Sequence, residues 1–192
     1  MNKVSVLSML IVVLNSLFGN VFAEEKTIID RKNIYGGKTV QILFSEVDQN
    51  LTAYKIVEYF NLRGDLRKKV VYRRLTTFND LKIDKVTELY AHDGTMQSVE
   101  VSIDAEKVKE TGIARIKTHF FPDKSIKRKE IFYGKSDFDD QIYSKSVDYF
   151  NYSGAKVRTE FFLIKEESIR TGYTKLVLSY FGGKLIKEEF LE

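Results

Sequence analysis

The chain has 192 residues, a formal net charge of +4 and no cysteine. Without cysteine, neither a disulfide framework nor a thiolate metal site can form. The near balance of 31 basic and 27 acidic side chains argues against a nucleic-acid partner. The 11 tyrosines and 14 phenylalanines supply apolar area for a core, and a single proline is compatible with long uninterrupted strands.

Residues 1–23 have the pattern of an export signal. A basic start at Lys3 is followed by an apolar stretch over residues 4–18 and by a small-residue cleavage site ending at Ala23. The apolar stretch is shorter than the ~20 residues that a spanning helix needs. We therefore expect cleavage near Ala23 and a periplasmic or extracellular location for the mature chain.

From residue 55 onward, an alternating pattern with a central turn recurs every thirty residues. Alternating polar and apolar residues on both sides of a glycine-containing turn are typical of a β-hairpin. Clear units start near Lys55, Lys85, Arg115, Lys145 and Lys175, and a degenerate unit lies near residues 33–44.

These repeats predict an all-β fold, in which residues 24–192 form a single domain of ~30-residue hairpins. We expect the hairpins to form an antiparallel meander sheet, either open or curled into a half-barrel; a closed barrel or a sandwich is the alternative. The charged links between hairpins are long enough for a loop or one helical turn, but the pattern predicts no packed helix.

A four-residue loop at residues 151–154 would place Lys145 directly opposite Glu160. The same register leaves Lys55 opposite Val70, without an acidic partner. Each charged pair would contribute only ~0.2–1 kcal/mol, but a slip by one residue would break all of them. The predicted cross-strand pairs are Lys85–Glu100, Arg115–Glu130, Lys145–Glu160 and Lys175–Glu189.

The opposite face of the predicted sheet is apolar. A sheet with one apolar face must curve or be covered. Ser146 is the one polar residue of this set. The predicted apolar set includes Ile56, Val71, Val86, Val101, Ile116, Ile131, Phe161 and Leu176.

An aromatic pair before the turn and a glycine within it mark these units: Tyr59, Phe60, Gly64 and Leu66 in one, and Tyr149, Phe150, Gly154 and Glu160 in another. This pattern resembles the bacterial MORN-type hairpin repeats, including those of YwqK-like proteins. The resemblance implies an elongated β-sheet with an interaction role and no catalytic residues.

The sequence suggests no catalytic, cofactor or metal site. The two histidines, His92 and His119, fall in different parts of neighbouring hairpins, so a shared metal is not expected. The acidic segment with Asp137, Asp139 and Asp140 lacks the spacing of an EF-hand and is better explained as a link between hairpins. We expect a protein that is not an enzyme and carries no cofactor.

The first full hairpin is more basic than the others. Its cationic residues could bind an anionic partner such as a lipid head group or an acidic polysaccharide, or they could protect a solvated sheet edge. Strict alternation would place Arg67 and Lys69 on one face and Lys68 on the other. The cationic residues are Arg63, Arg67, Lys68, Lys69, Arg73 and Arg74.

Together these features predict an exported, non-enzymatic scaffold that binds another macromolecule or an envelope component. The expected partner is a protein or an envelope polymer, with a lipid or another anionic surface as an alternative and no nucleic acid. A second hypothesis is a periplasmic carrier that binds a lipid or another apolar ligand on a curled aromatic face.

Overall fold

The computed structural model describes residues 25–29, 32–44, 53–78, 81–135, 137 and 141–192. The export signal predicted at residues 1–23 lies outside them, as do Asp139 and Asp140, and the side chain of Arg74 is not described. The strands and helices are β1 (Glu25–Ile29), β2 (Gly36–Leu43), β3 (Ala53–Asn61), β4 (Leu66–Phe78), β5 (Leu81–Tyr90), β6 (Met96–Ile103), α2 (Ala105–Thr111), β7 (Ile113–Phe120), β8 (Ile126–Tyr133), β9 (Tyr143–Phe150), β10 (Lys156–Leu163), α3 (Lys165–Thr171), β11 (Lys175–Phe181) and β12 (Lys184–Leu191).

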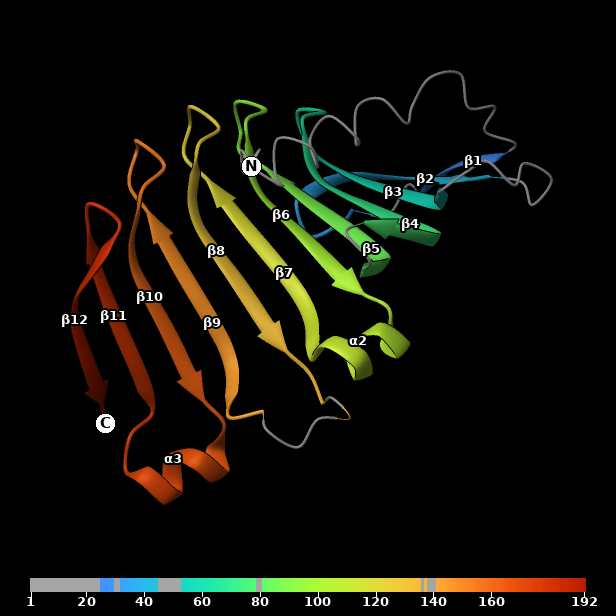
Figure 1. The fold of residues 1–192 in the computed structure, drawn as a ribbon. Coiled ribbons are helices and arrows are strands. Elements are labelled where there is room, and N and C mark those ends of the chain that lie inside the picture. The colour runs from blue at the N-terminus through green and yellow to red at the C-terminus, as the bar shows by residue number, and fades with distance from the viewer. Residues whose placement is uncertain (1–24, 30–31, 45–52, 79–80, 136, 138–140) are drawn as a thin grey trace.

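All twelve strands belong to one sheet, in which each strand pairs with its neighbours in sequence. Every pairing is antiparallel, and β1 and β12 form the two ends of the strand order. The predicted all-β meander is therefore confirmed. Figure 1 shows an open sheet, so the alternative of a closed barrel is wrong.

The turns of the four hairpins from β3 to β10 share one geometry. The amide of Asn151 donates to the carbonyl of Ala155 at 3.0 Å, and the amide of Gly154 donates to the carbonyl of Asn151 at 2.9 Å. Gly154 adopts a left-handed conformation with φ 78°, which glycine reaches without strain. The same pair of hydrogen bonds closes the turns at residues 61–65, 91–95 and 121–125. Asn151 is thus paired with Ala155, and the loop consists of residues 152–154. The prediction had paired Ala155 with Phe150, so the turn shifts the register by one residue.

A bulge after each turn shifts the register by one further residue. Lys156 pairs with Phe150 and Arg158 pairs with Tyr149, which leaves Val157 as the extra residue. Register shifts follow the turns of the other hairpins as well. A bulge of this kind bends the strand and increases its twist.

The predicted direct pairing of lysine or arginine with glutamate is therefore wrong by two residues. The prediction assumed a four-residue loop with no bulge, and the turn and the bulge each add one residue. The observed partners are Lys55–Tyr72, Lys85–Ser102, Arg115–Phe132, Lys145–Phe162 and Lys175–Leu191.

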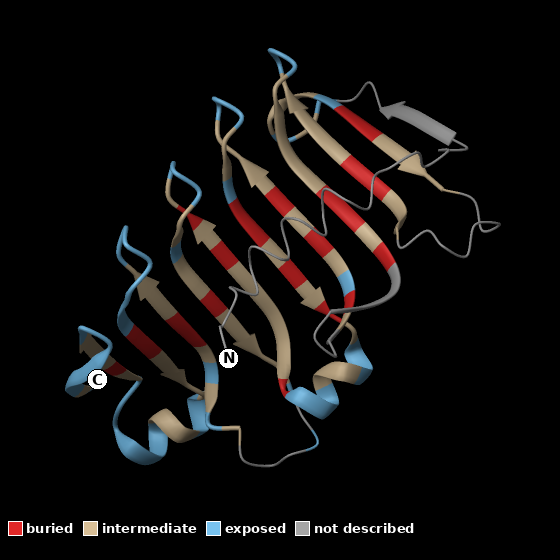
Figure 2. Ribbon diagram, turned by 45° about the horizontal axis from the view of Figure 1, so that its top comes forward, coloured by how far each residue is buried: buried red, intermediate tan, exposed pale blue. Residues whose placement is uncertain are grey.

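Because the shift is an even number of residues, the paired side chains beyond the bulges stay on their expected faces. One face, here called the apolar face, carries a continuous row of paired residues in which Ser146 is the polar exception. The other is called the charged face. The row on the apolar face consists of Ile42, Ile56, Val71, Val86, Val101, Ile116, Ile131, Ser146, Phe161, Leu176 and Phe190. Figure 2 shows that the buried residues form a band across the middle of the strands.

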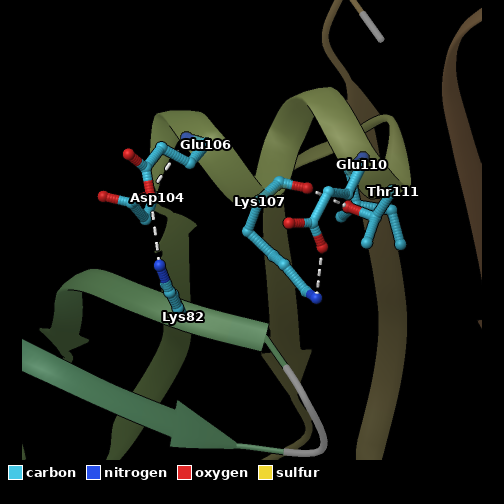
Figure 3. A network of polar contacts seen from close by, with 7 residues as sticks. Lys82, Asp104, Glu106, Lys107, Glu110 and Thr111 are labelled. Carbon is cyan, nitrogen blue, oxygen red and sulfur yellow. Dashed lines mark hydrogen bonds and ion pairs between the residues drawn. The ribbon is translucent and has the colours of Figure 1, made fainter. Parts of the chain in front are cut away.

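Two links contain short helices, and the prediction that no helix would pack is wrong for α2. Asp104 caps α2 by accepting a hydrogen bond from the amide of Glu106 at 3.0 Å, and Gly112 ends the helix with φ 70°. Val108 packs against the hydrophobic core, and Lys82 of β5 pairs with Glu106 at 3.1 Å (Figure 3). Caps at both ends allow a seven-residue helix to form.

The helices and the hairpin turns lie at opposite ends of the strands (Figure 1). α3 occupies the corresponding link sixty residues after α2, and the glycine that ends it, Gly172, is also left-handed. Among the described residues, no helix is both long enough and apolar enough to cross a membrane.

Candidate binding surface

A continuous row of paired residues crosses the charged face from β3 to β11. Its cationic members recur on every second strand, because each repeat contributes one cation from the first strand of its hairpin, which we call the outgoing strand. Adjacent strands are ~4.8 Å apart, so successive cations start from backbone positions ~9.6 Å apart. In order, the row consists of Lys55, Tyr72, Lys85, Ser102, Arg115, Phe132, Lys145, Phe162 and Lys175. We call its five cations (Lys55, Lys85, Arg115, Lys145 and Lys175) the cation row.

Aromatic rings separate the cations along this row. The guanidinium carbon of Arg115 lies 4.0 Å from the centre of the Phe132 ring, and the ammonium of Lys145 lies 5.8 Å from the same centre. The Phe162 ring lies between Lys145 at 4.3 Å and Lys175 at 5.6 Å. Each such contact is worth ~0.5–1 kcal/mol at an exposed site. The rings therefore hold the cations apart in a regular order.

The predicted glutamates do form ion pairs, but with the cation of the following hairpin. The observed register places each glutamate diagonally across from that cation, on the same face of the sheet. Six of the eight predicted residues thus form ion pairs with one another in other combinations than predicted, and Glu189 pairs instead with Lys187 at 2.7 Å. The observed pairs are Arg115–Glu100 at 3.4 Å, Lys145–Glu130 at 3.9 Å and Lys175–Glu160 at 3.5 Å.

The carboxylates lie deeper than the cations around them. The Glu160 side chain is 7% exposed, whereas its partners Arg158, at 2.9 Å, and Lys175 are 45% and 25% exposed. The Tyr149 hydroxyl also donates to Glu160, at 3.3 Å. Positive charge therefore forms the outer layer of this face, and the glutamates support it from below.

The central rows of the two faces of the sheet carry opposite net charge, and outside these rows the apolar face also holds Lys156, 3.0 Å from Asp148. From β2 to β12, three rows on the charged face contain ten basic and four acidic side chains: Lys55, Lys68, Lys85, Arg115, Lys117, Arg128, Lys145, Arg158, Lys175 and Lys187 against Glu100, Glu130, Glu160 and Glu189. The two rows between them on the apolar face contain two basic and four acidic side chains: Lys69 and Lys129 against Glu58, Glu88, Asp148 and Glu188. The excess of cations on one face is not visible in the small net charge of the whole chain.

The basic residues of the first full hairpin do not form one surface. The ammonium of Lys68 lies 5.3 Å from the ring centre of Tyr59, whereas Lys69 pairs with Glu58 at 3.7 Å, so these two lysines point to opposite faces. Arg67 is the bulge residue and lies over Tyr35, 6.0 Å from its ring centre. The expected face shared by Arg67 and Lys69 is not found, because the bulge breaks strict alternation.

The remaining cations of this hairpin are also dispersed. Arg63 lies in an exposed turn, where it lines an open hollow with Tyr35 and His92. Arg73 is buried, and this burial lowers the pKa of its guanidinium although Glu88 opposes the shift. Among the cations whose side chains the structure describes in this hairpin, Lys68 and, through its contact with Tyr35, Arg67 extend the positively charged surface.

His119 lies on the charged face within a network of charged side chains. Its Nε2 is 2.9 Å from a carboxylate oxygen of Glu130 and 3.3 Å from a guanidinium nitrogen of Arg128. Burial and the positive charge of Arg128 lower the pKa of His119, outweighing the opposite effect of Glu130, and Lys117 lowers it further. Among the described residues, no group of three or more histidine, aspartate or glutamate side chains could hold a metal ion.

The depressed pKa of His119 predicts a specific loss of stability in acid. In the unfolded chain the pKa is near its ordinary value of ~6.5. Between that value and the lower folded pKa, the unfolded state binds a proton that the folded state does not, so the free energy of unfolding falls as pH decreases. We expect the wild type to lose stability relative to His119→Gln when the pH is lowered from about 7 to about 5. Urea unfolding at several pH values measures this, and parallel curves for the two proteins would contradict it.

This surface can bind anions through partly exposed cations and apolar rings through its aromatic side chains. The alternation of lysine or arginine with phenylalanine or tyrosine was present in the sequence, where Tyr72, Phe132 and Phe162 each follow a cation by seventeen residues. Compared with known proteins, the chain matches no family model and no curated protein.

Proposed function

We propose that this chain is an exported, non-enzymatic binding protein whose charged face engages an anionic macromolecule. The observation that carries the proposal is the difference between the central rows of the two faces: ten basic and four acidic side chains in three rows of the charged face, two and four in two rows of the apolar face. A face with excess positive charge attracts polyanions and raises their rate of association.

Two sequence features support this assignment. The export signal expected at residues 1–23 would bring the charged face into contact with envelope or extracellular polymers. The resemblance to MORN-type repeats, which we keep as part of the proposal, implies an interaction role. Side chains that converge on a reaction centre are the usual sign of an enzyme, whereas the cation row is spread along the whole sheet.

The test compares two variants that lose the same charge from different places. Arg115→Gln with Lys145→Gln removes two neighbouring members of the cation row without placing a new acidic group beside Glu100 or Glu130. The matched control, Lys109→Gln with Lys165→Gln, removes two exposed lysines from α2 and α3. Both variants lower the net charge by two.

Binding should be measured at low salt against a polycarboxylate, a polyphosphate and vesicles containing anionic lipid. We expect the wild type to bind at least one of them, the cation-row variant to bind at least ~10-fold more weakly, and the control to differ by less than ~2-fold. Added salt should weaken the interaction, because screening reduces it over ~8 Å at physiological ionic strength. Far-UV circular dichroism and urea unfolding establish that both variants are folded.

Failure of the wild type to bind any of these probes would overturn the proposal. Equal losses in the two variants would also overturn it, because binding would then depend on net charge and not on this face. If lipid extracted from the purified protein proved stoichiometric, and if the two variants retained it, the carrier hypothesis would replace the scaffold.

A further inference from the structure

We propose that the occupant of the charged face is a linear acidic polysaccharide that lies across the strands and carries one carboxylate in every second sugar. This inference rests on the proposed function and specifies its ligand. The polymer would run along the cation row from β3 to β11, with each carboxylate beside one cation and the intervening sugar over the residue between them.

The spacing of the cations selects the ligand. Each cation belongs to an outgoing strand, and the register places all five in one row. Their backbone positions are ~9.6 Å apart, twice the separation of neighbouring strands. A β-linked disaccharide has about this length. A polymer with a uronic acid in every second sugar therefore presents its charges in phase with the row.

The side chains between the cations suit a sugar. Phe132 lies between Arg115 and Lys145, Phe162 lies between Lys145 and Lys175, and Tyr72 lies between Lys55 and Lys85. These rings are partly exposed, so beside the cations that lie over them they offer apolar contact to the C–H groups of a pyranose, and the cations offer charge-assisted hydrogen bonds to a carboxylate. Ser102 occupies the fourth intervening position and can donate a hydrogen bond instead.

Other polyanions match this row less well. Phosphates of one strand of a DNA duplex are ~3.4 Å apart along its axis, so each period of the row would contain about three of them and only one would lie beside a cation. A flat membrane follows the row less well, because the strands of a sheet rotate relative to one another and the row turns with them. Figure 1 shows this progressive rotation of the strands across the sheet. A single flexible chain can follow it.

The experiment is a titration of the full-length protein with oligosaccharides of defined length that alternate a uronic acid with a neutral hexosamine. Hyaluronan fragments of one to eight disaccharides are suitable probes. We expect affinity to rise by about two- to fivefold with each disaccharide, as for an exposed ion pair. The rise should stop at about five disaccharides, because the row contains five cations.

Two variants test whether the polymer lies along the whole cation row. Lys55→Gln removes the cation at one end, so the affinity should stop rising one disaccharide earlier while short fragments bind as before. Lys145→Gln removes a cation from within the row and should weaken the binding of all long fragments. Oligogalacturonate with the same number of charges, which carries a carboxylate on every sugar, should bind more weakly than hyaluronan.

The outcomes separate this inference from the function on which it rests. Equal affinity for hyaluronan and oligogalacturonate, or a rise that continues beyond eight disaccharides, would overturn the proposed spacing but leave an anion-binding face. Tighter binding to single-stranded DNA or to anionic vesicles would identify another class of occupant and also overturn it. If no polyanion binds at low salt, both proposals fail.

Discussion

Replacing Gly37 with alanine is expected to destabilise the pairing of β2 with β3 by about 3 kcal/mol or more. A Cβ at this position would lie 2.1 Å from the carbonyl oxygen of Asn61 and 2.4 Å from that of Phe60. Both are backbone atoms of paired strand residues, so they cannot turn away as a flexible side chain could. Overpacking typically costs ~1–3 kcal/mol, and contact with fixed backbone places this variant at the upper end or above it.

Gly64→Ala is the matched control for this prediction. Gly64 has a left-handed conformation with φ 88°, but nothing lies within 4 Å of an added Cβ. The control should therefore lose only the ~1–2 kcal/mol that a left-handed conformation costs an ordinary residue. Urea unfolding measures both variants, and amide hydrogen exchange shows whether β2 and β3 lose protection first. A loss at Gly37 no larger than that at Gly64 would refute the steric explanation.

Replacing Glu160 with glutamine is expected to destabilise the protein by about 1.5–3 kcal/mol. Glu160 is 5% exposed and accepts from Tyr149, while Arg158 and Lys175 lie at 2.9 Å and 3.5 Å. Glutamine keeps the shape of the side chain but removes the charge that both cations share. Hydrogen bonds to charged groups contribute ~1.5–3 kcal/mol. Without the carboxylate, Arg158 and Lys175 would each lose the negative charge beside them.

The equivalent change at Glu189→Gln should have little effect. Glu189 belongs to β12, at the end of the strand order, and its side chain is 39% exposed with Lys187 at 2.7 Å. Exposed ion pairs contribute ~0–1 kcal/mol. Thermal and urea unfolding of the two variants should therefore differ clearly. Equal stability would mean that the buried glutamates do not support the cations of the charged face.

The two helices were missed because the thirty-residue hairpin repeat does not predict them, although the links between the hairpins contain local signals for a helix. The link after β6 contains an N-capping residue, Asp104, and ends at Gly112, which are ordinary signals for a helix. The link before β11 ends at Gly172 in the same way but lacks a side-chain cap. Seven residues are few for an isolated helix, and for α2 the packing of Val108 against the core supplies the missing stability.

The sequence by itself determined the hairpins, their order and the face on which the paired side chains beyond the bulges lie. Alternation with period two and a turn every thirty residues are properties of residues close together in the sequence. Hairpins that follow one another directly along the chain are most simply arranged as a meander sheet. The apolar row from Ile56 to Leu176 was predicted correctly for this reason. Six of the eight residues predicted to form ion pairs also do so, because the two-residue error in register left them on the same face of the sheet.

Only the tertiary structure decided which residues meet. The left-handed residue in each turn and the bulge that follows it shift the register by two residues, and neither is specified by alternation. That shift removes Glu160 from Lys145 and brings it to Lys175 of the next hairpin. It also aligns Lys145 with Phe132 and Phe162, and so creates the cation row. A row that crosses nine strands depends on the register at every pairing, and register is the property that short sequence patterns constrain least.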